Sequence, residues 1–200
     1  RLSACRDTAS AAASLAAVCP ACGKPLVARY DLARLAATKR RDALAGAGMW
    51  RYLDVLPLAP ESVTVRLGEG GTPLVPLPAL ARELGLAALT IKDEAGNATQ
   101  SFKARGLALA VNAAAAMGKP AIALPSAGNA GSAAAAYAAA AGLPCRIAVP
   151  EVTDEAFLIE QRAFGAEVAL VSGTIADAGR KIAEWARAPG WWNVATFKEP

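Results

Sequence analysis

A lysine near the middle of the sequence lies where its side chain could act as a nucleophile. Residues 93–106 read DEAGNATQSFKARG, and Ser101 is suited to cap a helix whose first turn contains Lys103. The positive end of a helix disfavours the protonated amine, and partial burial beside Phe102 and the nearby Arg105 would act in the same direction. An uncharged lysine amine can form a Schiff base with an aldehyde. The alternative interpretation is a solvated lysine on an exposed helix turn.

A second candidate site follows the next apolar run, where residues 124–132 read LPSAGNAGS. Gly128 and Gly131 allow the backbone to come close to a ligand. The N–H groups at the start of a helix, helped by the Ser126 hydroxyl and the Asn129 amide, can bind a carboxylate or a phosphate. The alternative is an ordinary turn in which Ser126 or Asn129 only caps the helix.

The elements that would position these two segments alternate between strands and helices. From residue 79 onward, short apolar runs alternate with helical stretches, several of which end at a glycine. The predicted strands are 89–92, 121–124, 146–149 and 167–171, and the predicted helices are 79–84, 101–117, 129–141, 154–164 and 174–187. This alternation predicts an α/β fold with a parallel sheet covered by helices on both faces.

Both candidate sites fall in loops that follow predicted strands. Ligands of parallel sheets bind beyond the carboxyl ends of the strands, so adjacent loops would place Lys103 and the 126–131 turn at one crevice. The sequence contains no histidine, which excludes Ser-His-Asp hydrolysis, HExxH zinc chemistry and acid–base catalysis by histidine. A lysine beside an anion-binding turn instead indicates pyridoxal-phosphate chemistry on an amino acid.

Composition and charge argue against two other classes of protein. Hydrophobic residues make up 54% of the chain and charged residues 19%, which is typical of a packed globular protein. The net charge is +4 and the basic residues are scattered apart from 39–41, so we expect no nucleic-acid partner. The longest uncharged stretch, 120–145, is interrupted by prolines and glycines, so we expect no membrane partner.

The first thirty residues contain three cysteines. The apolar run 11–18 is followed at once by Cys19 and Cys22 where a signal peptide would have its cleavage site, so we expect a cytoplasmic location. Residues 19–24 read CPACGK, which has the shape of half a zinc knuckle, but Cys5 alone would have to supply the other half. We therefore expect a degenerate hairpin of the zinc-ribbon type without a bound metal, and a functional zinc site is the alternative.

The predicted organisation has three parts. Residues 1–30 form the knuckle-like segment, 31–60 a connector that lies over the main domain, and 61–200 the catalytic domain. The connector is expected to contain helices near 31–37 and 50–56, and the catalytic domain is expected to begin with a strand at 63–65.

Two of these segments resemble known motifs. SFKARG at 101–106 resembles the lysine motif of the fold-type-II pyridoxal-phosphate enzymes, which share a tryptophan synthase beta-like fold, and SAGNAG at 126–131 resembles their SxGNxG loop. Within that superfamily the chain is most similar to the threonine synthases, on the strength of GEGGTPL at 68–74, CPACGKPLVARYDL at 19–32 and FKEP at 197–200.

The resemblance implies a role for each matching residue. Lys103 would bind pyridoxal 5′-phosphate as a Schiff base and then act as a base, Phe102 would shape the cofactor pocket, and Asn129 would donate a hydrogen bond to the 3′ oxygen of the cofactor ring. The substrate would be bound by Ser126, Ala127, Gly128, Asn129 and Ala130, with its carboxylate held by Ser126, Ala127, Gly128 and Ala130.

The resemblance also implies a reaction. The substrate would be O-phospho-L-homoserine, a small amino acid that water converts to L-threonine with loss of phosphate. The alternatives are a threonine or serine dehydratase, a related ammonia-lyase, and a non-catalytic fragment of the same fold.

Two departures from the family pattern matter. NATQ at 97–100 stands where the family often has Asn-Pro-Thr-Gly, and no glycine-rich phosphate loop follows Val171. We therefore expect the chain to be the N-terminal part of an enzyme. A homodimer is compatible with these features.

Overall fold

The computed structural model describes most of the chain from residue 46 onward and parts of the N-terminal region. The described residues are 2–5, 8–10, 19, 22, 24, 27–38, 44, 46–187 and 190–195. No helix in this part of the chain is both long enough and apolar enough to cross a bilayer.

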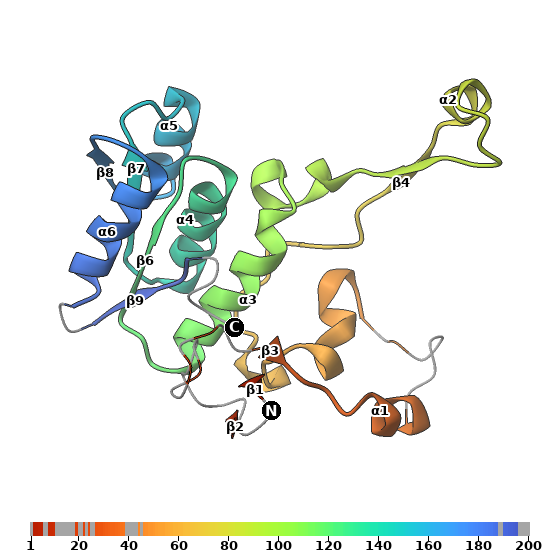
Figure 1. The fold of residues 1–200 in the computed structure, drawn as a ribbon, viewed down its shortest axis with the longest axis horizontal. Coiled ribbons are helices and arrows are strands. Elements are labelled where there is room, and N and C mark those ends of the chain that lie inside the picture. The colour runs from red at the N-terminus through yellow and green to blue at the C-terminus, as the bar shows by residue number, and fades with distance from the viewer. Residues whose placement is uncertain are drawn as a thin grey trace.

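A four-stranded parallel sheet forms the centre of the main domain (Figure 1). Its strands are β6 (Ala121–Pro125), β7 (Cys145–Pro150), β8 (Glu167–Val171) and β9 (Trp191–Asn193), in the order β8-β7-β6-β9. All three neighbouring pairs are parallel. The predicted strands at 121–124, 146–149 and 167–171 are confirmed, whereas β9 was not predicted.

Helices cover both faces of this sheet, as predicted. They are α3 (Lys103–Ala116), α4 (Asn129–Ala141), α5 (Glu155–Ala163) and α6 (Ile175–Trp185). Strand residues alternate between the faces, so Ile122 and Leu124 pack with α3 and α4 whereas Ala123 packs with Ala178 and Ile182 of α6.

The alanines of α4 explain how closely the helices pack. Ala133, Ala134, Ala135 and Ala138 are fully buried, and α3 lies along this helix. Because a methyl group adds little bulk, α4 can contact the sheet and α3 at the same time.

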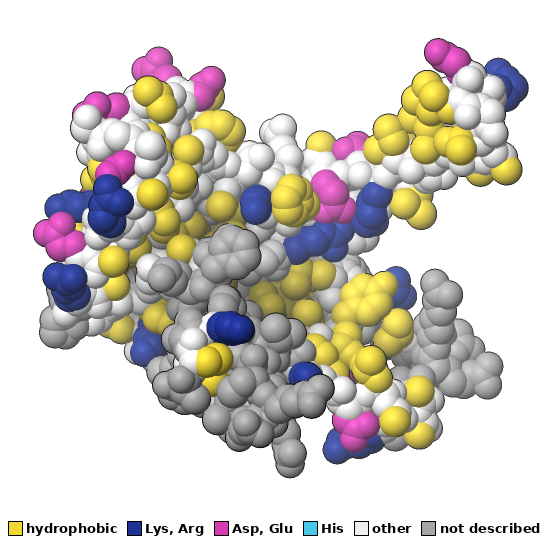
Figure 2. Space-filling model, viewed as in Figure 1, with side chains coloured by type: hydrophobic (Ala, Val, Ile, Leu, Met, Phe, Trp, Pro, Cys, Tyr) yellow, Lys and Arg dark blue, Asp and Glu magenta, His cyan; other side chains and the backbone are white. Residues whose placement is uncertain are grey.

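A narrow arm extends from the main domain (Figure 1). It consists of β4 (Leu74–Pro76), α2 (Pro78–Glu83) and β5 (Thr90–Lys92), and β4 and β5 pair antiparallel. Hydrophobic side chains gather over the arm in Figure 2, and its large exposed apolar residues are Leu74, Val75, Leu80, Leu84, Leu86 and Ile91.

The arm corrects one prediction. The strand predicted at 89–92 exists as β5, but it belongs to this two-stranded hairpin and not to the parallel sheet. The sequence carried a signal for this difference, because central strands of parallel sheets are apolar on both faces, whereas Thr90 and Lys92 flank a single apolar residue. All three residues of β5 are exposed.

The predicted strand at 63–65 is also absent from the described residues. The amide side chain of Asn112, fully buried on α3, takes the place of a neighbouring strand. Its Oδ1 accepts from the N–H groups of Thr64 and Val65 at 2.8 and 2.9 Å, and its Nδ2 donates to the oxygens of Val65 and Ala108, each at 2.8 Å. The segment is therefore extended and hydrogen-bonded without joining a sheet.

The N-terminal region forms a small antiparallel sheet of β1 (Leu2–Cys5), β2 (Thr8–Ser10) and β3 (Val27–Ala28), in the order β2-β1-β3. Cys19 is buried and Cys22 is exposed. Among the residues that the structure describes, no cluster of cysteine and carboxylate side chains could hold a metal ion. The side chain of Cys5 lies outside the described residues, so the absence of a metal stays a prediction.

The connector contains α1 (Leu32–Thr38) and two 3-10 helices, η2 (Gly48–Val55) and η3 (Pro60–Ser62). α1 confirms the helix predicted near 31–37. The helix predicted near 50–56 differs in type, because η2 is a 3-10 helix. It buries Met49 and Trp50 in the main core.

Candidate active site

Lys103 is the first residue of α3. The Ser101 hydroxyl accepts a hydrogen bond from the Lys103 backbone N–H at 3.2 Å, so Ser101 caps this end of the helix, as predicted, although Phe102 occupies the cap position itself. The Lys103 side chain is half-buried, and its Nζ lies 5.0 Å from the centre of the Phe102 ring. Phe102 remains 58% exposed. The predicted contact between Phe102 and the lysine is present.

The chain just before Lys103 has an unusual backbone. Two short 3-10 helices, η4 (Glu94–Gly96) and η5 (Ala98–Gln100), lead into α3. Thr99 and Gln100 have φ angles of 56° and 50°, in the left-handed region that residues with a Cβ rarely adopt. Backbone strain of this kind clusters at functional sites. The position of Gln100 is one of those where the sequence departs from the family pattern.

Ser126 shapes the second predicted segment from within. Its hydroxyl accepts from the N–H of Gly131 at 2.8 Å and donates to the oxygen of Gly128 at 3.1 Å, while its backbone N–H donates to Ala148 at 3.1 Å. Both donors of Ser126 are therefore used inside the protein. Its predicted hydrogen bond to a substrate carboxylate stays a prediction, and its structural contribution is the shape of the turn.

The neighbouring N–H groups are still available to a ligand. In the described part of the chain, no acceptor lies in hydrogen-bond range of the N–H groups of Ala127, Asn129 and Ala130. Asn129 is the first residue of α4, and its side chain is exposed. Together, these three N–H groups at the start of a helix form a turn that can accept an anion.

Gly131 is needed for packing as much as for the turn. A Cβ on this residue would lie 2.6 Å from Nε2 of Gln161 on α5, and Gln161 is fully buried. A glycine therefore lets the start of α4 rest directly on this side chain. Sequence reasoning identified Gly131 as a residue for close ligand approach and did not foresee its contact with Gln161.

The structure places the two predicted segments on neighbouring elements, by a route that differs from the prediction. β5 is outside the parallel sheet, so Lys103 does not follow a strand adjacent to β6. Instead, α3 packs along α4 (Figure 1). The short helix η5 contacts α4 as well. Ala98 of η5 and Ala130 of α4 both pack against the main core. Lys103 and the 126–131 turn therefore lie at the beginnings of two helices that pack side by side.

Arg105 does not act on the lysine as a free charge. Its guanidinium forms an ion pair with Glu94, with 2.7 Å between Nε and Oε2. Hydrogen bonds from Arg105, Thr72 and Asn97 stabilise the charged carboxylate and lower the pKa of Glu94 from 4.5 to about 2. The Arg105 charge that the sequence places near Lys103 is therefore neutralised by Glu94.

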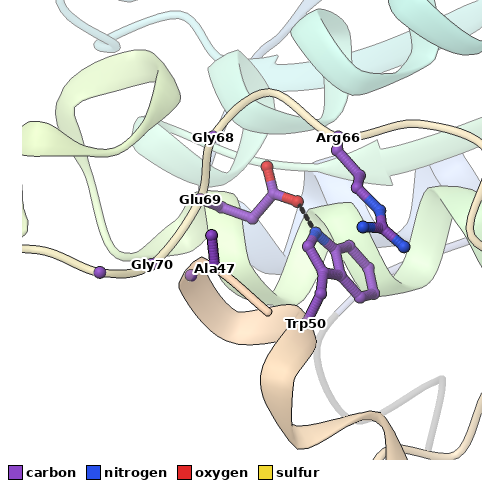
Figure 3. Close-up of a pocket in the computed structure, with 8 residues that line it drawn as sticks. Ala47, Trp50, Arg66, Gly68, Glu69 and Gly70 are labelled. Carbon is purple, nitrogen blue, oxygen red and sulfur yellow. Dashed lines mark hydrogen bonds between the residues drawn. The ribbon is translucent and has the colours of Figure 1, made fainter. Parts of the chain in front are cut away.

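Sequence reasoning missed the role of Glu69 in the GEGG segment. This carboxylate is 1% exposed, and it accepts a hydrogen bond from the Trp50 indole (Figure 3). It also accepts from the Tyr137 hydroxyl at 2.5 Å and from the Leu67 N–H at 2.8 Å. Burial, followed by the bond to Glu69, raises the pKa of Tyr137 well above its usual range. Glu69 thus joins the connector, the 68–71 loop and α4.

The same loop borders a pocket of about 310 Å³. Its lining residues are Ala47, Gly48, Trp50, Arg66, Gly68, Glu69, Gly70 and Gly71 (Figure 3). Neither Lys103 nor any residue of the 126–131 turn lines it. Gly48 and Gly70 are required here, because a Cβ on either would lie within 2.3 Å of the facing backbone. This pocket results from two glycine-rich loops that pack against each other.

The sequence is similar to a known enzyme family and to several of its members. The family model described as "Pyridoxal-phosphate dependent enzyme" matches residues 65–200. The threonine synthase of Methanocaldococcus jannaschii is 41% identical over 132 residues, which cover 66% of this chain and 33% of that protein. The threonine synthase of Halalkalibacterium halodurans is 41% identical over 137 residues, covering 66% and 38%.

A solved structure agrees with this pattern. A cysteine synthase from Entamoeba histolytica matches with a TM-score of 0.59 and 25% identity, covering 62% of this chain and 40% of that one. The chain thus spans about a third to two fifths of the length of these relatives.

Proposed function

Because the chain belongs to the family of pyridoxal-phosphate dependent enzymes, we propose that Lys103 is its cofactor-binding lysine and that the 126–131 turn holds the substrate carboxylate. The observation that carries this proposal is the position of an amine and of three N–H groups, which have no acceptor among the described residues, at the beginnings of two packed helices. Either segment alone has an ordinary structural explanation, whereas their combination is what amino-acid chemistry on this cofactor requires.

The residues of the site fit the cofactor. Lys103 supplies an amine for the aldehyde, and no ion pair or hydrogen bond of its Nζ is present among the described residues. The exposed ring of Phe102 beside this amine offers an apolar surface, and the exposed amide of Asn129 could donate to the ring oxygen. The N–H groups of Ala127 and Ala130 remain for the carboxylate.

The proposed mechanism assigns binding and proton movement to this chain. Pyridoxal phosphate, when bound, supplies an electron sink for the bonds at the substrate α carbon. The turn binds the substrate carboxylate and so orients the α proton toward the Lys103 side. The Lys103 amine would remove one proton from the α carbon and one from the β carbon, and would return one to the γ carbon and one to the α carbon. Each removal requires an amine that is neutral at that stage. Phosphate leaves the γ carbon and water adds at the β carbon, so that O-phospho-L-homoserine and water become L-threonine and phosphate.

Among the members of the family we favour a threonine synthase, because the similar proteins named above are threonine synthases. Both bacterial and archaeal threonine synthases match at 41% identity over two thirds of this chain. The second candidate is a threonine or serine dehydratase or a related ammonia-lyase, which would use the same lysine and turn. The products separate the two: release of inorganic phosphate from O-phospho-L-homoserine supports the first, and a 2-oxo acid with ammonia from threonine or serine supports the second.

A trapping experiment tests the role of Lys103 directly. The purified protein is incubated with pyridoxal phosphate, reduced with borohydride and mapped by mass spectrometry. We expect the adduct on Lys103, its loss in Lys103→Ala with an unchanged far-UV circular dichroism spectrum, and its retention in Lys119→Ala. An adduct that forms only on other lysines would refute the proposal.

The location, the partners and the domain boundaries of the protein are further parts of this proposal. We infer a cytoplasmic enzyme with an amino acid as its small-molecule partner, without a nucleic-acid or membrane partner, and compatible with a homodimer. The division at residues 30 and 60 and the zinc-ribbon-like nature of the N-terminal sheet belong to the same proposal. Metal analysis and the mass of the assembly in solution would test these features.

A further inference from the structure

The two ends of the arm are fastened together where they join the main domain. The N–H of Asp93 donates to the oxygen of Pro73 at 3.0 Å, and Nζ of Lys92 donates to the oxygen of Thr72 at 3.1 Å. The Thr72 hydroxyl donates to Oε1 of Glu94 at 2.7 Å. Thr72 is buried, so the base of the arm is a closed structure and not a loose hinge.

Arg105 connects this base to the helix that carries Lys103. Its Nε and Nη2 donate to the two carboxylate oxygens of Glu94 at 2.7 and 2.8 Å, and Nη2 also donates to the Thr72 hydroxyl at 3.1 Å. The pair is mostly covered, with side-chain exposures of 29% for Arg105 and 24% for Glu94. Two parallel hydrogen bonds between a planar guanidinium and a planar carboxylate fix orientation as well as distance.

Asn97 extends the network to the loop before the lysine. Its Nδ2 donates to Oε2 of Glu94 at 2.8 Å, and its Oδ1 accepts from the N–H of Gly70 at 2.9 Å. Asn97 is only 4% exposed. The chain then passes through the left-handed residues Thr99 and Gln100 directly to the cap of α3. The network thus holds both sides of the strained segment, Asn97 before it and Arg105 after it.

Because Arg105 and Lys103 lie in the same helical turn, the contacts that hold Arg105 also fix the orientation of Lys103. Residues two positions apart on an α-helix point about 200° away from each other. When Arg105 is held against the base of the arm, Lys103 must therefore point to nearly the opposite side of α3. Rotation of the first turn would break both hydrogen bonds between Arg105 and Glu94.

We propose that Arg105 and Glu94 are positioning residues for Lys103, which set the direction of its amine by fixing the first turn of α3 to the base of the arm. The proposal rests on the function proposed for Lys103 and extends it to two residues that need not touch cofactor or substrate. It also makes the arm part of the site's geometry, because displacement of the arm would move Glu94 and, through Arg105, the lysine.

The test compares Glu94→Gln and Arg105→Lys with a matched control. Glu94→Gln removes the charge at nearly constant shape, and Arg105→Lys keeps a charge without the planar fork. The control is Glu167→Gln, which breaks a surface pair between Arg146 and Glu167 with a similar 2.6 Å contact far from the site. Unfolding midpoints and circular dichroism show that each variant is folded before the comparison is made.

Two readouts are used. The first is the rate of amide hydrogen exchange of residues 98–104 in the absence of cofactor. We expect this rate to rise by about tenfold or more in both variants, which corresponds to a free energy of local opening that is lower by about 1.4 kcal/mol. The second is the rate of borohydride trapping of pyridoxal phosphate on Lys103, which we expect to fall by at least about tenfold. Glu167→Gln should change neither.

The outcomes separate this inference from the function on which it rests. If the unmodified protein forms no adduct at Lys103, the proposed function fails, whatever the exchange data show. If the adduct forms and Glu94→Gln leaves both exchange and trapping unchanged, the positioning role is refuted. The same holds if Glu167→Gln produces equal effects, or if Arg105→Lys behaves as the unmodified protein, because the argument requires the two-point fork.

Discussion

The hydroxyl of Tyr137 should make a large contribution to stability for a single oxygen atom. Tyr137 is fully buried in α4 and donates to the Glu69 carboxylate across 68 positions of sequence. Tyr137→Phe removes this donor and keeps the ring. The carboxylate would keep the Leu67 N–H and the Trp50 indole as donors, so Glu69 would be left partly satisfied in a buried site.

The size of the effect follows from these contacts. A hydrogen bond to a charged group contributes about 1.5–3 kcal/mol, and the remaining donors to Glu69 favour the lower half of that range. With a urea dependence of about 2 kcal/mol per molar, the midpoint of unfolding should fall by roughly 1 M. The slope of the transition should not change, because the same surface is exposed on unfolding.

Urea unfolding followed by circular dichroism measures this change. Tyr30→Phe is the control, because Tyr30 is exposed and its substitution should alter stability by less than about 0.5 kcal/mol. On a Glu69→Gln background, Tyr137→Phe should cost less than it does in the unmodified protein. Equal midpoints for Tyr137→Phe and the unmodified protein would show that the bond to Glu69 does not hold the loop on α4.

Two further predictions concern the segment before Lys103 and its anchor. Gln100→Gly should raise the free energy of unfolding by about 0.5–1 kcal/mol, because glycine adopts the φ of 50° without a Cβ penalty. An unchanged or lower thermal midpoint would show that the backbone of Gln100 is not strained. The hydrogen bonds from Arg105 hold the pKa of Glu94 at about 2 in the folded protein, below its usual value of 4.5, so the contribution of Glu94 to stability is present above pH 4.5 and is lost as the pH falls toward 2. Glu94→Gln should therefore be less stable than the unmodified protein at pH 6, and urea titrations should show that this difference narrows by pH 2; a difference independent of pH would exclude the ion pair as its cause.

Much of the α/β core was predictable from local patterns. The helix at 129–141 and the strand at 167–171 have the bounds that the sequence predicted, because apolar runs, capping residues and terminal glycines mark them locally. β9 was missed, since Trp191–Asn193 is too short to give a period and forms by pairing with β6. The segment at 63–65 was wrongly predicted as a strand because its partner is one side chain, Asn112, at a distance that no local pattern reveals.

The candidate site also has features that the sequence predicted and features that it did not. The lysine motif and the glycine-rich turn were visible as residue types at short spacing. Their juxtaposition was predicted on wrong grounds, because β5 lies in the arm and the contact is made through α3, α4 and η5. Glu69 was not foreseen at all, because the donors that surround it come from three separate parts of the chain.

The sequence by itself determined which side chains are available for chemistry and which short segments carry them, because both depend on neighbours within a few positions. Only the tertiary structure decided how the first turn of α3, which begins at Lys103, is anchored to the base of the arm. That anchoring depends on Arg105, Glu94 and Asn97 meeting Thr72 and Gly70, whose positions along the chain differ by more than twenty residues, and such contacts form only when the whole domain packs.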